Sequence, residues 1–390
     1  MIKYFTVENF YSIGNESVLE FDLHIKKDAA FLAHPTIGFA GSNASGKSNV
    51  LKALSFVLWF AGESFLELKA KLNDIFHFTG DIKWDKIHIP VEIFITNQDK
   101  PCKFHIIFTN NGIDYEYLLT VNTEKVFEEE FYYYPKKRQK LIYHRKELHV
   151  KFGDGISKFD TKDLRENCSI ISLAAQFETQ EQAKIVKDYT IFPTNIPAGK
   201  DFEDIEFNDY YVAFLESNPF LKEEAIKLLK LADLGIENFY VKRNIEDEPL
   251  AFFEHRINGN LIALPSKSQS SGTLQMLAIF VYVLQALNNG KLLILDEIEI
   301  KLHQNLVAYI IGLFQNPETN TKSAQLIFAF HNTSLMEILK PEQLWFAEKN
   351  ENGHSEFYCA ANVQGIKDLH KKSLETLYRI GRFGATPKLL

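Results

Sequence analysis

The stretch that decides the fold is GSNASGKS at residues 41–48, which matches the pattern G-x-x-x-x-G-K-[ST]. The apolar run TIGFA precedes it, and residues 48–60 place apolar side chains on one helical face, at Val50, Leu51, Leu54, Val57 and Leu58. A strand, a glycine-containing loop and a helix in this order are typical of a phosphate-binding loop. A chance match in an unrelated loop is the alternative, which the flanking segments disfavour.

The chemistry of this loop predicts what it binds. Its glycines let the backbone curl so that successive N–H groups face a triphosphate, and Lys47 brings a positive charge to the outer phosphates. The hydroxyl of Ser48 can ligate Mg²⁺, and the following helix points its N-terminus at the phosphates. We therefore expect ATP and Mg²⁺ to bind at Gly41, Ser42, Asn43, Ala44, Ser45, Gly46, Lys47, Ser48 and Asn49.

Two carboxylates end a second apolar run, KLLILDE at residues 291–297. Asp296, at the tip of the predicted strand, would hold Mg²⁺ through water, and Glu297 would polarise the attacking water. The alternative is a buried strand that ends in a solvated acidic turn. The phosphate-binding loop upstream favours the catalytic interpretation.

A histidine follows a third apolar run, AQLIFAF at residues 324–330. The C-terminal ends of parallel strands line the ligand crevice of an α/β sheet, so His331 is a candidate catalytic residue near the γ-phosphate. A lone histidine is more often an ordinary surface or core residue. Its position one strand beyond Asp296 and Glu297 favours the functional interpretation.

The segment SQSSGT at residues 268–273 begins a predicted helix over residues 272–289. Ser270, Ser271 and Gly272 would form a second anion site at the N-terminus of this helix. A monomer with one phosphate-binding loop has little need of such a site, whereas a dimer could place it across from the partner's loop. The alternative is an ordinary helix cap formed by Ser270 or Ser271.

The rest of the chain predicts a split α/β fold. Residues 87–152 are typical of an antiparallel meander, with strand-like segments HIPVEIFIT, KFHIIFTN, DYEYLLTVN, EEEFYYYP and KLIYHRKELHVKF. Residues 163–234 are mostly helical, residues 236–263 return to strands, and the last third alternates helices with buried strands of a parallel sheet covered on both faces. We expect four segments: an N-terminal nucleotide-binding half (1–80), the meander (81–160), a helical insert (161–240) and a C-terminal half (241–390).

Composition indicates a folded, acidic protein. Among 390 residues, 46% are hydrophobic and the formal net charge is −8, so nucleic acid could bind only through a local basic patch. One basic cluster interleaves with Tyr134 and Tyr143 and would be a nucleic-acid or partner-docking surface, or else the solvated face of a hairpin. It comprises Lys136, Lys137, Arg138, Lys140, Arg145 and Lys146. The three cysteines fit buried thiols in a reducing compartment. The sequence shows no secretory signal, and the apolar run 274–287 is too short to span a bilayer, so we expect a cytoplasmic protein without membrane contact.

Together these motifs resemble a known family. GSNASGKSN, QSSGT, LLILDE and FAFHN occur in the same order as in ABC-type ATPases, and their spelling resembles the branch that contains SMC proteins and OLD-type ATPases. The opening IKYFTVENFYSI, the segment DEIEIKLHQ and the tail RIGRFGATP look like AAA-family ATP-binding proteins of bacterial anti-phage and abortive-infection systems, of the AbiL type. The resemblance implies a P-loop NTPase of ABC-ATPase type, with a mixed or parallel sheet and flanking helices.

The resemblance also implies a mechanism. ATP would join two copies of the chain, with Ser270 and Gly272 contacting the partner's γ-phosphate and residues 298–303 crossing the interface. Because no nuclease or protease signature is visible, a separate effector would act under the control of this homodimer. Gln269 departs from the leucine of transporters, and Gln98 and Gln176 are both open as lid residues. The rival functions are a DNA-repair or chromosome-associated ATPase and an ATP-binding scaffold that does not hydrolyse it.

Overall fold

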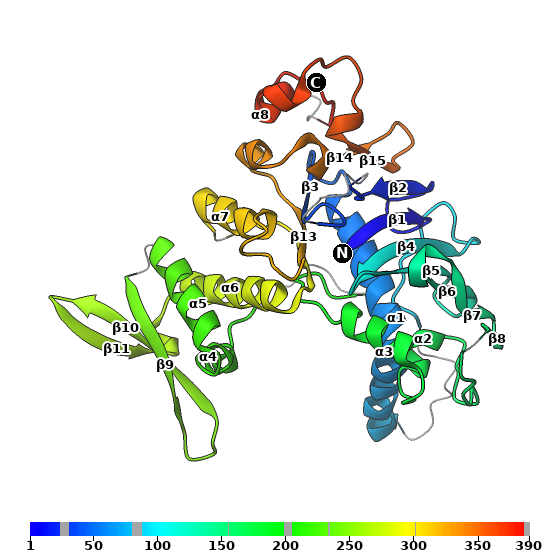
Figure 1. Cartoon of the computed structure of the whole chain (residues 1–390), viewed down its shortest axis with the longest axis horizontal. Coiled ribbons are helices and arrows are strands. Elements are labelled where there is room, and N and C mark those ends of the chain that lie inside the picture. The colour runs from blue at the N-terminus through cyan, green and yellow to red at the C-terminus, as the bar shows by residue number, and fades with distance from the viewer. Residues whose placement is uncertain are drawn as a thin grey trace.

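Three β-sheets and the helices between them make up the chain (Figure 1). The computed structural model describes residues 1–23, 31–79, 88–154, 156–198, 205–232, 235–300 and 302–385, with the side chains of the long first helix described as far as residue 67. The helices are α1 (Lys47–Thr79), α2 (Ile170–Ala174), α3 (Glu181–Thr190), α4 (Asp209–Glu216), α5 (Pro219–Leu231), α6 (Ser271–Asn289), α7 (Gln304–Gln315) and α8 (Leu374–Arg379).

The five-stranded sheet carries the phosphate-binding loop. Its order is β12-β13-β3-β14-β15, in which β15 is antiparallel to β14 and the others run parallel. Alternate residues of its strands pack on opposite sides, one set with α1 and the other with α6 and α7. The predicted parallel sheet covered on both faces is therefore confirmed, with strands β3 (Thr36–Ala40), β12 (Leu292–Leu295), β13 (Gln325–Ala329), β14 (Leu344–Lys349) and β15 (Ser355–Cys359).

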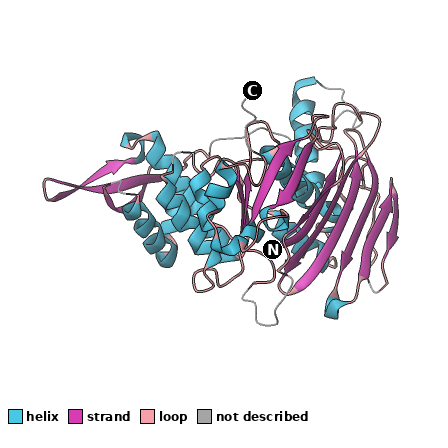
Figure 2. Cartoon of the chain, turned by 90° about the horizontal axis from the view of Figure 1, so that it is seen from above, coloured by secondary structure: helices cyan, strands magenta, loops and turns pink. Residues whose placement is uncertain are grey.

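The predicted meander belongs to a seven-stranded antiparallel sheet of order β2-β1-β4-β5-β6-β7-β8. β4 pairs with β1, so strands on either side of the phosphate-binding loop in sequence share this sheet. One face packs on α1, α2 and α3, and the helices lie along that side of the sheet in Figure 2. The strands are β1 (Ile2–Glu8), β2 (Ser17–Glu20), β4 (Cys102–Asn110), β5 (Ile113–Val121), β6 (Val126–Tyr133), β7 (Lys140–Lys146) and β8 (His149–Phe152).

The strand predicted at residues 88–96 is wrong. Only Ile93 pairs there, in an isolated bridge with Phe10. Ile89 and Val91 are buried as their alternation predicts, but Pro90 between them has no N–H to donate to a ladder. The segment KLIYHRKELHVKF also differs in detail, because it folds back as the hairpin β7–β8, with Glu147 at a positive φ of 52° in the turn.

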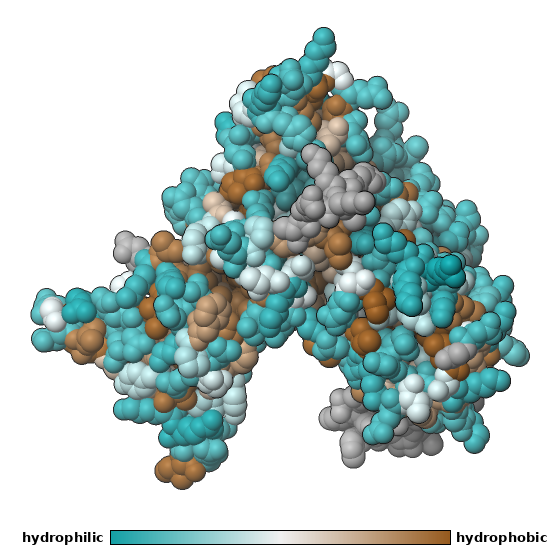
Figure 3. All heavy atoms as spheres, in the orientation of Figure 1, coloured by the Kyte–Doolittle hydropathy of each residue, from teal (hydrophilic) through white to brown (hydrophobic). Residues whose placement is uncertain are grey.

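A separate arm consists of α4, α5 and a three-stranded antiparallel sheet, β9 (Ile236–Arg243), β10 (Pro249–Ile257) and β11 (Asn260–Pro265). α5 contacts α6, which joins the arm to the five-stranded sheet. In the space-filling view a notch separates the arm from the part of the molecule that contains the seven-stranded sheet (Figure 3). The predicted helical insert thus packs in two places, with α2 and α3 against α1 and with α4 and α5 in the arm.

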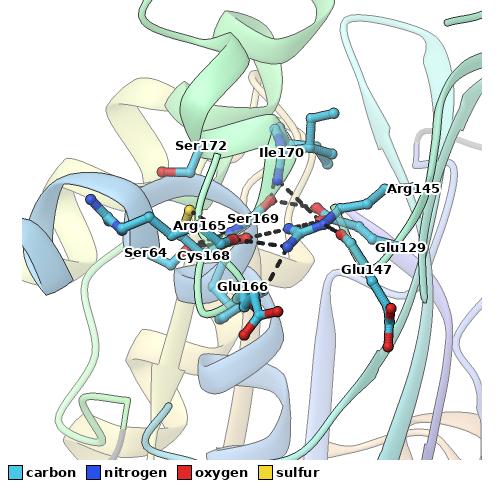
Figure 4. A network of polar contacts seen from close by, with 12 residues as sticks. Ser64, Glu129, Arg145, Glu147, Arg165, Glu166, Cys168, Ser169, Ile170 and Ser172 are labelled. Carbon is cyan, nitrogen blue, oxygen red and sulfur yellow. Dashed lines mark hydrogen bonds and ion pairs between the residues drawn. The ribbon is translucent and has the colours of Figure 1, made fainter. Parts of the chain in front are cut away.

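A buried ion pair ties the seven-stranded sheet to the helices (Figure 4). Arg145 on β7 and Glu129 on β6 are fully buried, with Nη1 of the arginine 3.3 Å from Oε2 of the glutamate. Glu129 accepts further hydrogen bonds from the hydroxyls of Tyr117 and Ser169 and from the N–H of Ile170. Arg145 donates to the carbonyl oxygens of Glu147, Arg165 and Cys168.

The same network reaches α1. The N–H of Ser169, which caps α2, donates to the hydroxyl of Ser64 at 2.9 Å. The N–H of Phe65 donates to the hydroxyl of Ser172 at 3.0 Å. Because α1 begins at the phosphate-binding loop, this network holds the middle of that helix against the seven-stranded sheet.

The tail of the chain packs on the five-stranded sheet. The ring of Tyr378 stacks on Phe346 of β14 at a centroid distance of 5.5 Å, and the ring of Phe383 lies 4.9 Å from the same ring. The hydroxyl of Tyr358 on β15 donates to the carbonyl oxygen of Phe383. Residues 374–385 therefore form part of the nucleotide-binding half.

Within the described part of the chain, two helical segments are long and apolar enough to cross a membrane by length and composition alone, residues 47–67 of α1 and the whole of α6. Within the structure, 72% of the apolar stretch in α1 and 44% of the apolar stretch in α6 are buried. Both segments contribute to the packed cores around the five-stranded sheet, which accounts for their apolar character. The three cysteines are free and buried, as expected.

Candidate functional site

The phosphate-binding loop follows β3 and has the backbone that its sequence predicts. Gly41 and Gly46 have φ values of 148° and 110°, in the region that favours glycine. A Cβ on Gly41 would collide with the carbonyl oxygen of Ala347, and one on Gly46 with the hydroxyl of Ser355. Both glycines are therefore required by the backbone and by close neighbours from β14 and β15.

Lys47 lies at the centre of the loop and is 5% exposed. Its Nζ donates to the carbonyl oxygens of Gly41 and Ser42, both at 3.0 Å. Burial lowers the pKa of Lys47, while the charge of Asp296 acts in the opposite direction. A buried cation surrounded by carbonyl oxygens and carboxylates is suited to exchange these contacts for those of an anionic phosphate.

Asp296 follows the last residue of β12 and is 4% exposed. Burial raises the pKa of its carboxyl group, and a hydrogen bond with the side chain of Ser48 opposes that rise. The N–H of Glu297 also donates to Oδ1 of Asp296 at 3.1 Å. A hydroxyl beside a carboxylate at the edge of a phosphate-binding loop is a donor set that fits Mg²⁺, which prefers oxygen ligands and the company of phosphate.

Glu297 and His331 face each other from the ends of neighbouring strands. His331 Nε2 lies 3.5 Å from Oε1 of Glu297, and the two side chains are 41% and 40% exposed. Glu297 has a φ of 48°, which is uncommon for a residue with a side chain and indicates local backbone strain. Because both side chains are partly exposed beside the phosphate-binding loop, they can contact a reacting phosphate and water.

Glu299 is a residue that the motif analysis missed. Its Oε1 accepts hydrogen bonds from the N–H groups of His331 and Asn332, and so joins the loop after β12 to the loop after β13. Its Oε2 is buried and has no hydrogen-bond partner among the residues that the structure describes. The sequence places Glu299 only in the loop expected to cross a dimer interface, and nothing in its spacing predicts this contact.

A pocket of about 380 Å³ brings most of the predicted residues together. Ser12, from the turn after β1, is the one lining residue that the sequence did not suggest; its hydroxyl accepts from Nδ2 of Asn49 at 2.6 Å and lies 2.7 Å from that of Ser355. The complete lining is Ser12, Asn43, Ala44, Ser45, Gly46, Lys47, Ser48, Asn49, Glu297 and His331.

The predicted second anion site lies elsewhere. Ser270, Ser271 and Gly272 do not line this pocket. Ser270 caps α6, with its hydroxyl accepting from the N–H of Thr273 at 3.1 Å, and it is exposed. The structure thus confirms the helix cap and leaves the anion-binding role of this N-terminus as a prediction. In the loop expected to cross a dimer interface, residue 301 lies outside the described residues.

Neither candidate lid glutamine lies in the pocket lining. Nε2 of Gln98 donates to the carbonyl oxygens of Ile93 and Phe94, and Nε2 of Gln176 donates to that of Ser172. Asn195 is instead the amide side chain, among the described residues, that bonds to the main chain of Asp296, just after β12.

The predicted basic cluster is not one surface. Side chains alternate between the two faces of β7, so Tyr143 and Arg145 point into the core while Lys146 is exposed and pairs with Glu128. Arg145 therefore has to be removed from the candidate nucleic-acid patch. Of the others, Lys136, Lys137 and Arg138 lie at the turn between β6 and β7 and Lys140 begins β7, whereas Lys146 lies at the opposite end of that strand.

Comparisons with known proteins found one family model and similar solved structures. A family model described as "AAA domain, putative AbiEii toxin, Type IV TA system" matches residues 37–337, which is more than half of the chain. The SMC head domain from Thermotoga maritima has a TM-score of 0.42 and 14% identity, over 92% of this chain and 98% of that chain. An SMC head bound to the C-terminal winged-helix domain of ScpA has a TM-score of 0.48 and 13% identity, over 92% and 96%. Among curated proteins, none matches this sequence.

Proposed function

We propose that this chain, which belongs to the AAA-domain family matched over residues 37–337, hydrolyses ATP and uses the ATP-bound state to pair with a second copy and control a separate effector. The observation that carries the proposal is the pocket in which Lys47, Ser48, Glu297 and His331 meet beside the buried carboxylate of Asp296. P-loop ATPases bind ATP together with Mg²⁺, and the residues present fit both.

Each residue has a proposed role in this reaction. Lys47 and the N–H groups of the loop bind the β- and γ-phosphates, and Ser48 and Asp296 hold Mg²⁺. The metal ion, when bound, neutralises charge on the transferred phosphate. Glu297 accepts a proton from the attacking water, or orients it, and His331 contacts the γ-phosphate from the next strand.

The proposed dimer gives Ser270, Ser271 and Gly272 a function. The first N–H groups of a helix have no acceptor within it, and the N-terminus of α6 is exposed rather than covered by the rest of the chain. A second copy could present this N-terminus to ATP held by Lys47. The ATP-bound dimer would then separate after hydrolysis, because the γ-phosphate that joined the two copies is lost.

The biological setting that we propose is cytoplasmic anti-phage defence in bacteria, since the family description names a toxin of a toxin–antitoxin system. The buried, free cysteines fit a reducing compartment. The nucleotide state would be the signal that the separate effector senses.

Two substitutions test the proposal. Lys47→Ala should abolish binding of a fluorescent ATP analogue. Glu297→Gln should retain binding, lose phosphate release and, with ATP and Mg²⁺, shift the protein from monomer to dimer in light scattering. Phosphate release unchanged in Glu297→Gln would refute its catalytic role, and a wild type that binds ATP but never turns it over would identify a scaffold. A gel shift with DNA at physiological salt would favour the chromosome-associated alternative.

A further inference from the structure

Asn195 is distant in sequence from every phosphate-site motif, yet its side chain bonds to both the N–H and the carbonyl oxygen of Asp296. Its Nδ2 donates to the carbonyl oxygen of Asp296 at 2.9 Å, and its Oδ1 accepts from the N–H of Asp296 at 2.8 Å. The two residues are 7% and 4% exposed. One amide side chain therefore satisfies both main-chain groups of the residue that carries the buried carboxylate.

Asn195 belongs to a strap, residues 193–196, that covers the free edge of the five-stranded sheet. β12 is the edge strand of that sheet. Thr194 pairs with Ile294 in a parallel bridge, and the N–H of Ile294 donates to the carbonyl oxygen of Pro193 at 3.3 Å. Ile196 is buried at the end of the strap. These contacts satisfy a strand edge that would otherwise be unpaired and fix Asn195 beside Asp296.

The main chain at Asp296 needs such a contact. The ladder between β12 and β13 ends with the pair Leu295 and Phe328, so Asp296 lies just beyond it. The next residue, Glu297, has a positive φ of 48°, which turns the chain sharply. A residue between the end of a ladder and a strained turn has no regular structure to set its orientation, and buried main-chain groups must still be paired.

We propose that Asn195 is a positioning residue for the ATPase reaction: by holding the N–H and C=O of Asp296, it sets where that carboxylate meets the hydroxyl of Ser48 and the magnesium–nucleotide. The inference rests on the proposed function. Residues that orient metal ligands typically change metal affinity about 10- to 100-fold when they are removed. Loss of Asn195 should therefore weaken the binding of Mg²⁺ more than the binding of the nucleotide itself.

The chain offers a matched control at the opposite end of β13. Asn320 is 2% exposed, and its amide holds the N–H and the carbonyl oxygen of Ala324 at 2.7 and 2.8 Å, and the carbonyl oxygen of Phe314 at 2.8 Å. Its bonds resemble those of Asn195 but lie away from the phosphate-binding loop. Asn320→Ala thus removes a similar main-chain contact without touching the proposed site.

The experiment titrates Mg²⁺ against binding of a fluorescent ATP analogue in the wild type, Asn195→Ala, Asn195→Asp and Asn320→Ala, with thermal unfolding measured in parallel. Asn195→Asp keeps nearly the same shape and the acceptor for the N–H of Asp296, so it leaves no cavity, but it turns an oxygen instead of an N–H toward the carbonyl oxygen of Asp296. We expect both alanine variants to unfold at lower temperature. Only the Asn195 variants should need about tenfold or more Mg²⁺ for half-saturation, with binding in the absence of Mg²⁺ unchanged.

Two results would overturn the inference. One is a Mg²⁺ titration of both Asn195 variants that matches the wild type, and the other is an equal shift in Asn320→Ala, which would mark a general effect of lost stability. Failure of the proposed function gives a different result, because it appears in the wild type itself, as absent nucleotide binding or absent phosphate release.

Discussion

Replacing Arg145, which is buried in an ion pair with Glu129, should destabilise the protein far more than replacing Lys146, its exposed neighbour on β7. In Arg145→Met, Glu129 would stay buried with its charge unpaired, although Tyr117 and Ser169 still donate to it. Breaking a buried ion pair from one side costs about 3–5 kcal/mol. A whole domain is stable by only about 5–15 kcal/mol, so this single change removes a large part of the total.

The assay is urea-induced unfolding followed by circular dichroism, arranged as a double-mutant cycle with Glu129→Gln and the combined variant. We expect the combined variant to lose less stability than the sum of the two single changes, because neither charge is then left alone in the core. Lys146→Ala is the matched control on the same strand, and its exposed pair with Glu128 should contribute about 0–1 kcal/mol. A loss in Arg145→Met within 1 kcal/mol of that control would refute this reasoning.

Three further predictions concern the loop, the outer sheet face and the tail. Gly46→Ala should lose binding of an ATP analogue because the added Cβ has no room, whereas Gly112→Ala should bind normally, because Gly112 also has a positive φ but no atom lies within 4 Å of the added Cβ. Equal binding in both variants would contradict the role of the loop backbone. Hydrogen bonding from His105 lowers the pKa of Glu116 from 4.5 to about 2, so the wild type should be more stable than Glu116→Gln above pH 4.5 and lose this advantage as the pH falls toward 2. A difference between the two in urea unfolding that does not change with pH would count against this. Deletion of residues 378–390 should lower the melting temperature and the ATPase rate, since the tail packs on β14; unchanged ATPase rate and dimerisation would end the idea that the tail supports the nucleotide-binding half.

Local patterns were enough to predict the parts of the molecule whose chemistry requires consecutive residues. The phosphate-binding loop is such a part, because its glycines, Lys47 and Ser48 act through one continuous turn of backbone between β3 and α1. The ends of β12 and β13 were predicted for the same reason, since a buried strand in a parallel sheet is an apolar run followed directly by the residues at its tip.

Patterns failed where a neighbour distant in sequence decided the outcome. Residues 88–96 alternate like a strand, but their main-chain groups bond singly to distant segments: the N–H of Ile89 donates to the carbonyl oxygen of Thr123, and the carbonyl oxygen of Glu92 accepts from the N–H of Tyr11. Arg145 looks like part of a basic surface, and only the pairing of β7 with β6 shows that it faces Glu129 in the core.

By itself, then, the sequence determined that this protein has a phosphate-binding loop, a parallel sheet and acidic residues at a strand tip, because each is encoded within a few adjacent positions. Tertiary structure alone decided that Ser12, Asn195 and Glu299 join them. Asn195 and Asp296 are separated by 101 positions, and their contact depends on a connecting strap lying along the edge of β12. No local pattern records such a contact, because it arises from how whole strands and connections pack rather than from the preferences of neighbouring residues.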